Sequence, residues 1–338
     1  MPSILDTSNY GGSVSSYDVA IVGAGPTGLY AAYYAGFRGF TTVVIDTLTE
    51  PGGQISAMYP EKLIFDVAGF PSIKGKDLVD GLLDQANQFK PDYLLGSQAQ
   101  TLTVNADTGV ELGLSDGSTI HAKALIITGG IGSFTPRELP VGPEWIGRGI
   151  FYFVPSLELH RDKDVVIVGG GDSAFDWALS LHGIAKTITI VHRRDTFRAH
   201  AASVDQVQGL DMNLITNSEV SQIDGTDWVE SVTVTHKDTM DSLVIPAQTV
   251  IAALGFIANI GPIAEWGLEL HKRRISVDSA TRTNLPRVFA AGDISVYEGK
   301  VPLISVGFGE AATAVNNATP WIDEHQGVFP GHSSGGAE

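Results

Sequence analysis

Two glycine-rich turns hold the residues of this chain whose types and spacing best suit ligand chemistry. The first is Gly23-Ala24-Gly25-Pro26-Thr27-Gly28, and the second is Gly169-Gly170-Gly171-Asp172-Ser173-Ala174. Glycine lets backbone N–H groups and a helix N-terminus come close to a pyrophosphate. One such turn has purely structural explanations, but each of these two follows an apolar strand and opens a helix. Together they predict two dinucleotide sites.

The residue that faces the adenosine ribose is acidic in the first unit. Asp46 lies 23 positions after Gly23 (46 − 23), at the end of the second strand of that unit. A carboxylate here accepts hydrogen bonds from ribose hydroxyls and repels a 2′-phosphate. The first site therefore suits FAD or NAD.

The equivalent position in the second unit is basic. His192 lies 23 positions after Gly169 (192 − 169) and begins a cluster of basic side chains. Guanidinium groups bind a phosphate dianion through paired hydrogen bonds, so the second site suits NADP(H). The plainer alternative is a solvated charge cluster at a helix start. The cluster consists of His192, Arg193, Arg194 and Arg198.

A third signal favours FAD over NAD at the first site. Val288–Ala291 is an apolar strand that ends in Gly292-Asp293. A buried Asp after such a strand can hold the ribityl hydroxyls of a flavin cofactor. The alternative interpretation is a simple turn with a helix N-cap.

Hydrophobic patterning supplies the elements that must position these residues. In the first unit, strands at Tyr17–Val22 and Thr41–Ile45 flank a helix that runs to about Gly36. Further ranges predict strands at 164–168 and 187–191, a helix over 175–182, antiparallel segments at 101–114 and 219–234, and an apolar, small-residue segment at 303–315. The predicted fold class is α/β, with two Rossmann-like dinucleotide-binding domains of the three-layer ββα type.

The length of 338 residues exceeds that of a usual single core, which predicts two domains. Glycine-bearing segments at Thr128–Pro136 and Leu254–Pro262 are the expected hinges, and they place the second unit inside the first. The expected domains are a first FAD-binding part over 1–135, an NADPH-binding domain over 136–256, and a second FAD-binding part over 257–338 with a C-terminal extension.

Composition excludes several classes of function. The net charge of −17 argues against a nucleic-acid partner, because phosphate neutralisation needs surplus Lys and Arg. The chain has no cysteine, which excludes disulfides, thiolate metal sites and dithiol redox chemistry within it. No apolar run is long enough to span a membrane and the N-terminus is not signal-like, so we expect a cytoplasmic protein without a metal site.

Several motifs resemble those of the thioredoxin-reductase-like ferredoxin–NADP(+) reductases, over nearly the full length of the chain. Thioredoxin reductases share this scaffold but place a Cys-x-x-Cys pair just before the second glycine turn, where this chain has Gly149–Pro155. Flavin-to-disulfide transfer is therefore impossible here. The motifs are Gly52-Gly53-Gln54, Ala57–Lys62, Asp66–Pro71, Gly169–Trp177, His192–His200, Ala290–Asp293, Tyr297–Lys300 and Gly307–Asn317.

The resemblance implies roles for individual residues. Tyr59 would stack on one face of the flavin, and His332 of the C-terminal extension would cover the other face in a homodimer, with Ser334 bonding to the flavin. A disordered tail is the alternative for these last residues, because Gly and Ser dominate there. The remaining implied FAD contacts are Asp46, Gln54, Phe134 and Asp293, with Gln100 at the adenine side through its backbone.

By the same resemblance, NADPH would deliver hydride to flavin N5, and single electrons would pass to ferredoxin or flavodoxin. No catalytic acid or base is required. An acidic ferredoxin needs a basic patch on this acidic protein, for which Lys272–Arg274 and Arg137 with Arg148 are candidates. Solvated surface charge is the plainer interpretation of each group taken alone. The alternatives are an NADPH diaphorase or quinone or ferric-chelate reductase and, from another class, a redox-sensing dinucleotide-binding protein.

Overall fold

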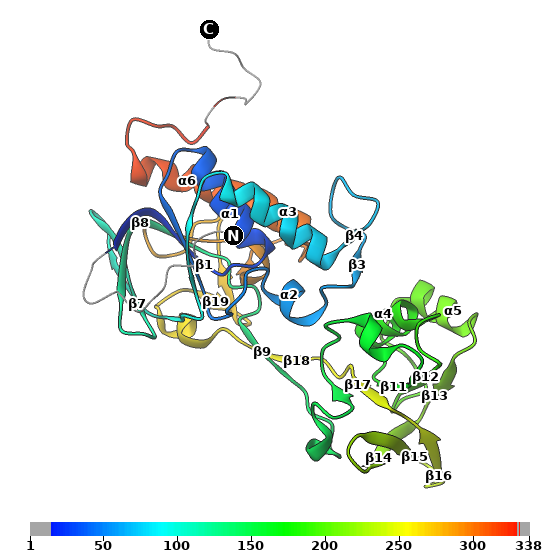
Figure 1. Ribbon diagram of the computed structural model, residues 1–338. Helices are drawn as coiled ribbons and strands as arrows, with labels where there is room; N and C mark the ends of the chain where they lie inside the picture. Colours follow the sequence, from blue (N-terminus) through cyan, green and yellow to red (C-terminus); the bar gives the residue numbers. More distant parts are fainter. Residues whose placement is uncertain (1–14, 330, 332–338) are drawn as a thin grey trace. The chain divides into compact units, whose positions relative to one another are not determined.

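A computed structural model of the chain describes residues 15–329 and 331, and shows two α/β units (Figure 1). Unit 1 comprises Met1–Ala57, Leu63–Ser133 and Ala258–Glu338, and unit 2 comprises Met58–Lys62 and Phe134–Ile257. The chain passes from one unit to the other within the two predicted hinge segments, through the paired strands β9 (Ser133–Pro136) and β18 (Phe256–Asn259). Met58–Lys62, which sequence analysis places in the first FAD-binding part, groups with unit 2.

Unit 1 is built on a seven-stranded sheet in the order β5-β2-β1-β8-β7-β6, with β21 also paired to β8. The pairs of β1 with β2 and β8, of β2 with β5, and of β21 with β8 are parallel, whereas β6, β7 and β8 pair antiparallel. The strands are β1 (Ser15–Val22), β2 (Thr42–Asp46), β5 (Asp92–Leu95), β6 (Ala99–Asn105), β7 (Gly109–Leu114), β8 (Thr119–Ile127) and β21 (Val288–Ala290).

Three helices pack together on this sheet, with α1 in contact with both α3 and α6 (Figure 1). Helix α1 is rich in alanine, and its buried Ala31, Ala32 and Ala35 allow close packing. These helices are α1 (Pro26–Phe37), α3 (Gly75–Asn87) and α6 (Ile304–Ile322). The other elements around the sheet are α2 (Gln54–Met58), the strands β3 (Leu63–Ile64), β4 (Ile73–Lys74), β19 (Leu270–His271), β20 (Arg274–Ser276) and β22 (Ser295–Val296), and the 3-10 turns Gly261–Glu265 and Gly292–Ile294.

Unit 2 has a five-stranded parallel sheet in the order β10-β17-β11-β12-β13 and a three-stranded antiparallel sheet β14-β15-β16. The strands are β10 (Ile150–Phe151), β11 (Asp164–Val168), β12 (Thr187–Val191), β13 (Asn213–Ile215), β14 (Ser218–Gly225), β15 (Val229–His236), β16 (Ser242–Pro246) and β17 (Thr249–Ala252). The helices are α4 (Asp172–Leu181) and α5 (Ala201–Gln208), with 3-10 turns at Pro143–Trp145 and Leu157–His160.

Alternating side chains of β11 divide the interior of unit 2 into two cores. Val165 and Ile167 pack with residues of α4, whereas Val166 and Val168 pack with residues of β14 and β15. Successive strand residues face opposite sides of a sheet, so a fully apolar strand needs a layer on each side. This arrangement confirms the predicted α/β class with Rossmann-like units of the ββα type.

Most predicted elements agree with the structure to within one or two residues, but α4 begins at Asp172 and not at Phe175. Gly171 is its N-cap, so the last residues of the predicted turn already belong to the helix. In the described part of the chain, no helix is long and apolar enough to cross a membrane.

Candidate functional site

The two glycine turns occupy equivalent positions in their units. Gly23 donates its N–H to the carbonyl of Ile45 at 2.8 Å, and Gly169 donates its N–H to the carbonyl of Val191 at 3.0 Å. Each bond ties the first glycine to the residue just before the predicted ribose-facing position. The equal spacing found by counting therefore corresponds to equal geometry.

The outer glycines of the first turn are required by the protein itself. A Cβ on Gly23, whose φ is +115°, would lie 2.5 Å from the carbonyl oxygen of Thr128, and a Cβ on Gly28 would lie 1.8 Å from the carbonyl oxygen of Gly23. In the second turn, a Cβ on Gly169 would lie 2.5 Å from the carbonyl oxygen of Ala253. These glycines permit close backbone packing.

The middle glycines have no such explanation. A Cβ on Gly25 or Gly171 would meet no atom within 4 Å. Their φ angles of −71° and −103° suit any residue. Neither neighbours nor backbone conformation calls for glycine at these positions, but a ligand that passes close to the backbone does. Both turns thus fit a dinucleotide.

Both helices that follow these turns begin without a side-chain cap. Gly25 is the N-cap of α1 and Gly171 is the N-cap of α4, and neither has a side chain that could bond to the N–H groups of the first helical turn. The first N–H groups of a helix carry partial positive charge and need acceptors. A pyrophosphate supplies such acceptors, so each helix start fits the phosphate part of a dinucleotide.

Asp46 is fixed beside the first turn by two backbone donors. Its carboxylate accepts the N–H of Ala24 at 2.6 Å and that of Leu48 at 2.8 Å. Burial raises the pKa of Asp46, and the hydrogen bonds from Leu48 and Ala24 oppose that shift. Each carboxylate oxygen keeps a further lone pair for a ribose hydroxyl.

The backbone of Asp46 also organises the segment that leads to Gln100. Ser97 donates its N–H to the carbonyl of Asp46 at 3.0 Å. Gln100 is exposed and lies at a register shift in β6, and its carbonyl accepts the indole N–H of Trp266 at 3.0 Å. Gln100 lies three residues after Ser97, and its role at the adenine side stays a prediction.

Two separate segments of unit 1 converge on Thr27 at the start of α1. A Cβ on Gly292 would lie 2.8 Å from Thr27 Oγ1, and a Cβ on Gly307 would lie 2.5 Å from the same atom. Asp293, half-buried, follows Gly292 directly. The close packing of these glycines places Asp293 beside the first helical turn of α1. Asp293 and the first glycine turn thus lie close together in unit 1, as the predicted FAD site requires.

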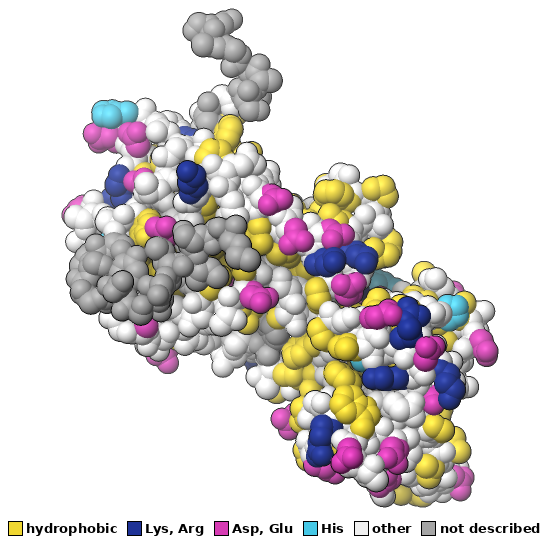
Figure 2. Space-filling model, in the orientation of Figure 1, with side chains coloured by type: hydrophobic (Ala, Val, Ile, Leu, Met, Phe, Trp, Pro, Cys, Tyr) yellow, Lys and Arg dark blue, Asp and Glu magenta, His cyan; other side chains and the backbone are white. Residues whose placement is uncertain are grey.

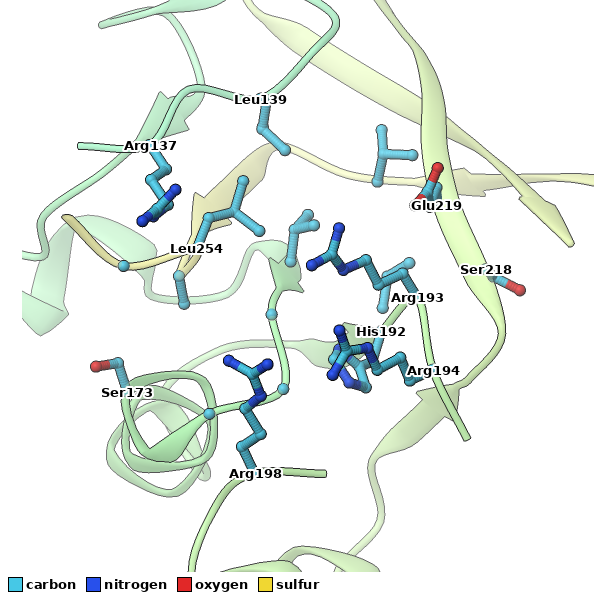
Figure 3. Close-up of a pocket in the computed structure, with 18 of the residues that line it drawn as sticks. Arg137, Leu139, Ser173, His192, Arg193, Arg194, Arg198, Ser218, Glu219 and Leu254 are labelled. Carbon is cyan, nitrogen blue, oxygen red and sulfur yellow. The ribbon is translucent and has the colours of Figure 1, made fainter. Parts of the chain in front are cut away.

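The second turn opens onto a pocket of about 600 Å³ in unit 2 (Figure 3). Four arginines line it, together with three carboxylates, so the pocket has an excess of positive charge although the chain has a net charge of −17. Arg137, which sequence analysis assigns to a candidate docking patch, belongs to this pocket. The charged lining residues are Arg137, Arg193, Arg194, Arg198, Glu138, Asp172 and Glu219.

His192 contributes packing to the pocket and not charge. Its ring lies against Gly170, where a Cβ would come within 2.3 Å of the imidazole, and its Nε2 lies 3.1 Å from the carbonyl of Thr196. Burial lowers the pKa of His192 below 6.5, the hydrogen bond to Thr196 opposes that shift and the neighbouring arginines add to it, so the neutral ring predominates at pH 7. Neutral Nε2 then donates to Thr196, and the arginines alone supply positive charge.

The loop that bears the arginines is tied to the second turn. Arg198 donates its N–H to the carbonyl of Gly170 at 2.7 Å, and His200 donates its N–H to Asp172 Oδ1 at 2.8 Å. Asp172 and Ser173 both line the pocket at the start of α4. The arginine loop and the glycine turn therefore form one structural unit.

Comparison with known proteins places this arrangement in a family. Residues 17–318 match the pyridine nucleotide-disulphide oxidoreductase family. The chain belongs to this family. The chain is 58% identical over 323 residues to the ferredoxin–NADP reductase of a Nocardioides species, covering 95% of this chain and 97% of the relative. It is 46% identical over 323 residues to that of Thermus thermophilus, covering 94% and 96%.

Solved structures similar to this chain include thioredoxin reductases, as the sequence predicts. The T. acidophilum enzyme superposes with a TM-score of 0.77 at 28% identity, covering 92% of this chain and 99% of the other. The Lactococcus lactis enzyme gives 0.75 at 25% identity, covering 91% and 99%. The predicted resemblance to thioredoxin-reductase-like proteins with ferredoxin–NADP reductase relatives is confirmed.

The other predicted flavin contacts do not all lie in unit 1. Gln54 begins α2 in unit 1, with its Nε2 3.5 Å from the position of a Cβ on Gly130. Tyr59 belongs to unit 2, where its half-buried ring packs against the core beside α4 and lies 5.8 Å from Lys62 Nζ. The side chain of Phe134, and all of His332 and Ser334, lie outside the described residues.

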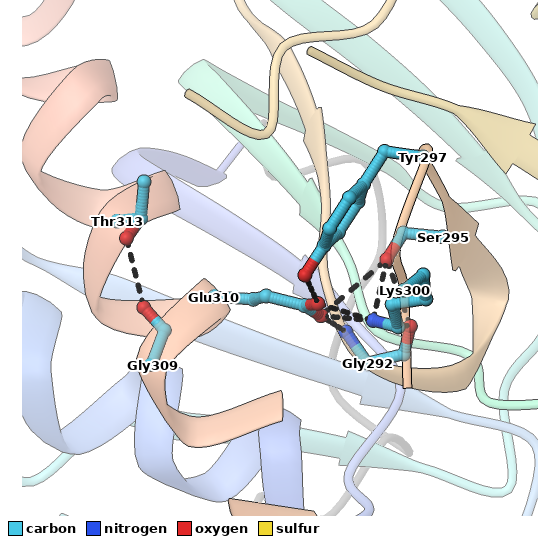
Figure 4. A network of polar contacts seen from close by, with 7 residues as sticks. All are labelled: Gly292, Ser295, Tyr297, Lys300, Gly309, Glu310 and Thr313. Carbon is cyan, nitrogen blue, oxygen red and sulfur yellow. Dashed lines mark hydrogen bonds and ion pairs between the residues drawn. The ribbon is translucent and has the colours of Figure 1, made fainter. Parts of the chain in front are cut away.

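One group of residues of this oxidoreductase was not assigned a role from its sequence (Figure 4). Lys300 and Glu310 form an ion pair, with side chains only 3% and 7% exposed. Glu310 accepts the N–H of Gly292 at 2.7 Å, and Lys300 donates to the carbonyl of Gly292 at 3.0 Å. The pair thus holds both polar groups of the residue that precedes Asp293.

Tyr297 and Ser295 complete this network. Tyr297 donates its hydroxyl to Glu310 at 2.7 Å, and Ser295 Oγ donates to the carbonyl of Gly292 at 2.8 Å. Burial, followed by the hydrogen bond to Glu310, raises the pKa of Tyr297 to about 12, so it remains a donor at neutral pH. Tyr297–Lys300 and Gly307–Asn317 were noted in the sequence only as motifs of a resemblance.

Proposed function

We propose that this chain is an FAD-dependent ferredoxin (or flavodoxin)–NADP(+) oxidoreductase. The observation that carries the proposal is the contrast between the two nucleotide positions, Asp46 in unit 1 and the arginine pocket in unit 2, in a chain without cysteine. Two redox cofactors then have no internal disulfide to reduce. The curated relatives named ferredoxin–NADP reductase support an external one-electron carrier as the acceptor.

In unit 1 the residues present fit FAD. Gly25 admits the pyrophosphate at the uncapped start of α1, Asp46 accepts the ribose hydroxyls, and Asp293 meets the ribityl chain. When bound, FAD accepts a hydride and gives up electrons singly. Among the described residues, the Lys300–Glu310 pair keeps the Asp293 turn in place for this cofactor.

In unit 2 the residues present fit NADP(H). Gly171 admits the pyrophosphate, and Arg193, Arg194 and Arg198 surround the position expected for a 2′-phosphate (Figure 3). Because planar guanidinium groups bind phosphate oxygens in pairs, these side chains select the phosphorylated nicotinamide. No general acid or base is needed for hydride transfer, so the chain's part is to bind and orient both cofactors.

Anaerobic spectrophotometry tests the proposal directly. The purified protein should be yellow, and its flavin band should bleach on addition of NADPH faster than with an equal concentration of NADH. Steady-state rates should be highest with ferredoxin or flavodoxin when quinone and ferric chelate are compared. A colourless protein, or one that prefers NADH, contradicts the cofactor assignment. Reduction of quinone or ferric chelate alone identifies a diaphorase, and a flavin that NADPH does not bleach points to a redox sensor.

The homodimer and the cytoplasmic location are further proposals, supported by the resemblance and the composition. Light scattering on the purified protein should give a mass near twice the 35.8 kDa of one chain. A mass of one chain at micromolar concentration contradicts the homodimer. Tyr59 and His332 as the residues that cover the two flavin faces also stay predictions, which flavin spectra of Tyr59→Ala and His332→Ala would test separately.

A further inference from the structure

A short hairpin in unit 1 presents three consecutive cations. Strands β19 and β20 pair antiparallel, Leu270 with Ile275 and His271 with Arg274, and the turn between them is Lys272-Arg273. We call residues 270–276 the basic hairpin. Both turn residues have positive φ, 48° for Lys272 and 67° for Arg273. Two-residue hairpin turns of this kind favour Asn and Gly, and long side chains there carry a conformational cost.

The charges of the basic hairpin are not neutralised by the protein. Lys272 and Arg273 are exposed, and Arg274 is half-buried. Within residues 15–329, no ion pair joins a carboxylate to any of the three. Arg273 donates to the backbone carbonyl of Ala258 at 2.9 Å, a neutral acceptor that leaves its charge intact. Three uncompensated cations lie together on a chain with a net charge of −17.

The register of the small sheet places the basic hairpin beside the Asp293 turn. β20 pairs parallel with β22, Ile275 with Ser295 and Ser276 with Val296. Because the pairing is parallel, Arg274, just before Ile275, lies on the side of Ile294, just before Ser295. Strand β20 also contacts the 3-10 turn Gly292–Ile294, which contains Asp293, in the part of unit 1 that fits FAD.

The other basic pair considered from the sequence does not form a separate cluster of three cations, because one of its two members belongs to the nucleotide pocket of unit 2. Arg137 lines the nucleotide pocket of unit 2. Arg148 donates to the carbonyl of Glu144 at 2.8 Å, and its guanidinium lies 5.0 Å from the Trp145 ring. On the face drawn in Figure 2, basic side chains occur in small groups among carboxylates. A compact cluster beside the flavin-binding turn is the arrangement that an acidic redox partner requires.

We propose that the basic hairpin is a docking surface for a small acidic iron–sulfur protein that exchanges single electrons with unit 1. The proposal rests on the proposed function and adds the surface at which the partner binds. Lys272 and Arg273 provide exposed charge at the tip, and Arg274 lies on the strand that contacts the Gly292–Ile294 turn. Complementary charge raises the rate at which two proteins meet and orients them, with little effect on the electron-transfer step itself.

The chain offers a matched control for a charge-reversal experiment. Lys90 is exposed, has a φ of 52° against 48° for Lys272, and takes part in no ion pair within the described residues of the chain. Lys272→Glu and Lys90→Glu therefore change the net charge by the same amount, and each replaces a lysine that has a left-handed backbone conformation. Lys272→Gln halves the charge change at the hairpin. Flavin content and ferricyanide reduction by NADPH report whether each variant is folded.

The measurement is steady-state NADPH-dependent reduction of a purified acidic [2Fe–2S] ferredoxin, at several ionic strengths. Lys272→Glu should lower kcat/KM for ferredoxin about tenfold at low salt, through KM, and Lys272→Gln should lower it less. Raising the ionic strength should reduce the differences in kcat/KM for ferredoxin between the variants and the parent, because salt screens exposed charges. Rates with an uncharged quinone, which surface charge does not steer, should be unchanged, and Lys90→Glu should stay within about twofold for both acceptors.

The outcomes separate the surface from the function. If the unmodified protein reduces ferredoxin and Lys272→Glu does so equally well, or if Lys90→Glu loses as much, the docking surface is wrong and the proposed function stands. If the unmodified protein reduces ferricyanide but not ferredoxin or flavodoxin, the proposed function and the docking surface are both wrong. A loss in Lys272→Glu that persists at high salt also overturns the proposal.

Discussion

Lys300 and Glu310 form a buried ion pair that holds both backbone polar groups of Gly292, the residue before Asp293. Glu310 accepts the Gly292 N–H at 2.7 Å and Lys300 donates to the Gly292 carbonyl at 3.0 Å. A buried ion pair contributes little stability relative to an apolar replacement, but it fixes geometry where it also binds the backbone. Here the fixed element is the turn that presents Asp293.

Breaking this pair on one side should be costly. Glu310→Gln or Lys300→Met leaves one buried charge without its partner, which costs about 3–5 kcal/mol of unfolding free energy. The double variant should recover most of that loss. The FAD dissociation constant should rise in both single variants, because the Gly292 turn is released. Thermal unfolding and flavin titration measure the two effects.

An exposed ion pair serves as the comparison. Lys123 contacts Asp18 at 2.8 Å, and its side chain is 50% exposed. Lys123→Met should cost less than about 1 kcal/mol and leave FAD binding unchanged. Equal losses in Lys123→Met and Lys300→Met, or single and double variants at Lys300 and Glu310 that lose the same amount, contradict the role assigned to the buried pair.

The middle glycines should separate stability from binding. Gly25→Ala and Gly171→Ala place a methyl group in open space at ordinary φ angles. We expect the apoprotein to be as stable as the parent, or more stable by about 0.4–1 kcal/mol. FAD affinity in the first variant and NADPH affinity in the second should fall at least about tenfold, a loss of about 1.4 kcal/mol.

Gly28→Ala is the contrasting variant. Its Cβ would lie 1.8 Å from the backbone oxygen of Gly23, so the turn cannot keep its shape. This variant should yield little folded protein, which melting curves and solubility measure. If Gly25→Ala bound FAD normally, the open space at that position would not be the path of a pyrophosphate.

Arg194→Glu should change the preference between the two nicotinamides. Arg194 lines the basic pocket, where a carboxylate would repel a 2′-phosphate. A charged hydrogen bond contributes about 1.5–3 kcal/mol, so KM for NADPH should rise roughly 10- to 100-fold while KM for NADH changes little. Arg194→Lys keeps the positive charge but not the planar guanidinium, so its KM for NADPH should lie between those of the parent and Arg194→Glu. Equal changes in KM for NADPH and NADH would contradict the assignment of the 2′-phosphate to this pocket.

His160 should make unit 2 sensitive to acid. The ring is fully buried, and its Nδ1 lies 3.3 Å from Thr249 Oγ1. Burial, together with the charge of Lys163, lowers the pKa of His160 from 6.5 to about 4. The unfolded chain therefore binds a proton at a higher pH than the folded chain does, and stability is lost as pH falls from about 6.5 to about 4.

The expected size is roughly 2 kcal/mol between pH 7.5 and pH 5. In His160→Gln this part of the pH dependence should be absent, so its melting temperature should fall less over that range. His182→Gln, the same substitution at an exposed position, is the control and should keep the parent's dependence. Parallel curves for the parent and His160→Gln contradict the assignment.

The sequence by itself determined the local parts of both nucleotide sites. The strands Asp164–Val168 and Thr187–Val191 match their predicted bounds. The equal spacing from Gly23 to Asp46 and from Gly169 to His192 corresponds to equivalent hydrogen bonds. Such features follow from short-range rules, because a strand, a glycine turn and a helix start depend on residues that are neighbours in the chain.

The tertiary structure decided what depends on residues far apart. Arg137 joins the pocket of Arg193 and Arg198. Lys300 and Glu310 come together only because α6 packs against the Gly292 turn. Burial also decided that His192 is neutral and that the arginines carry the charge. Periodicity and spacing cannot predict these relationships, because side-chain pairing and desolvation arise when separate elements pack together.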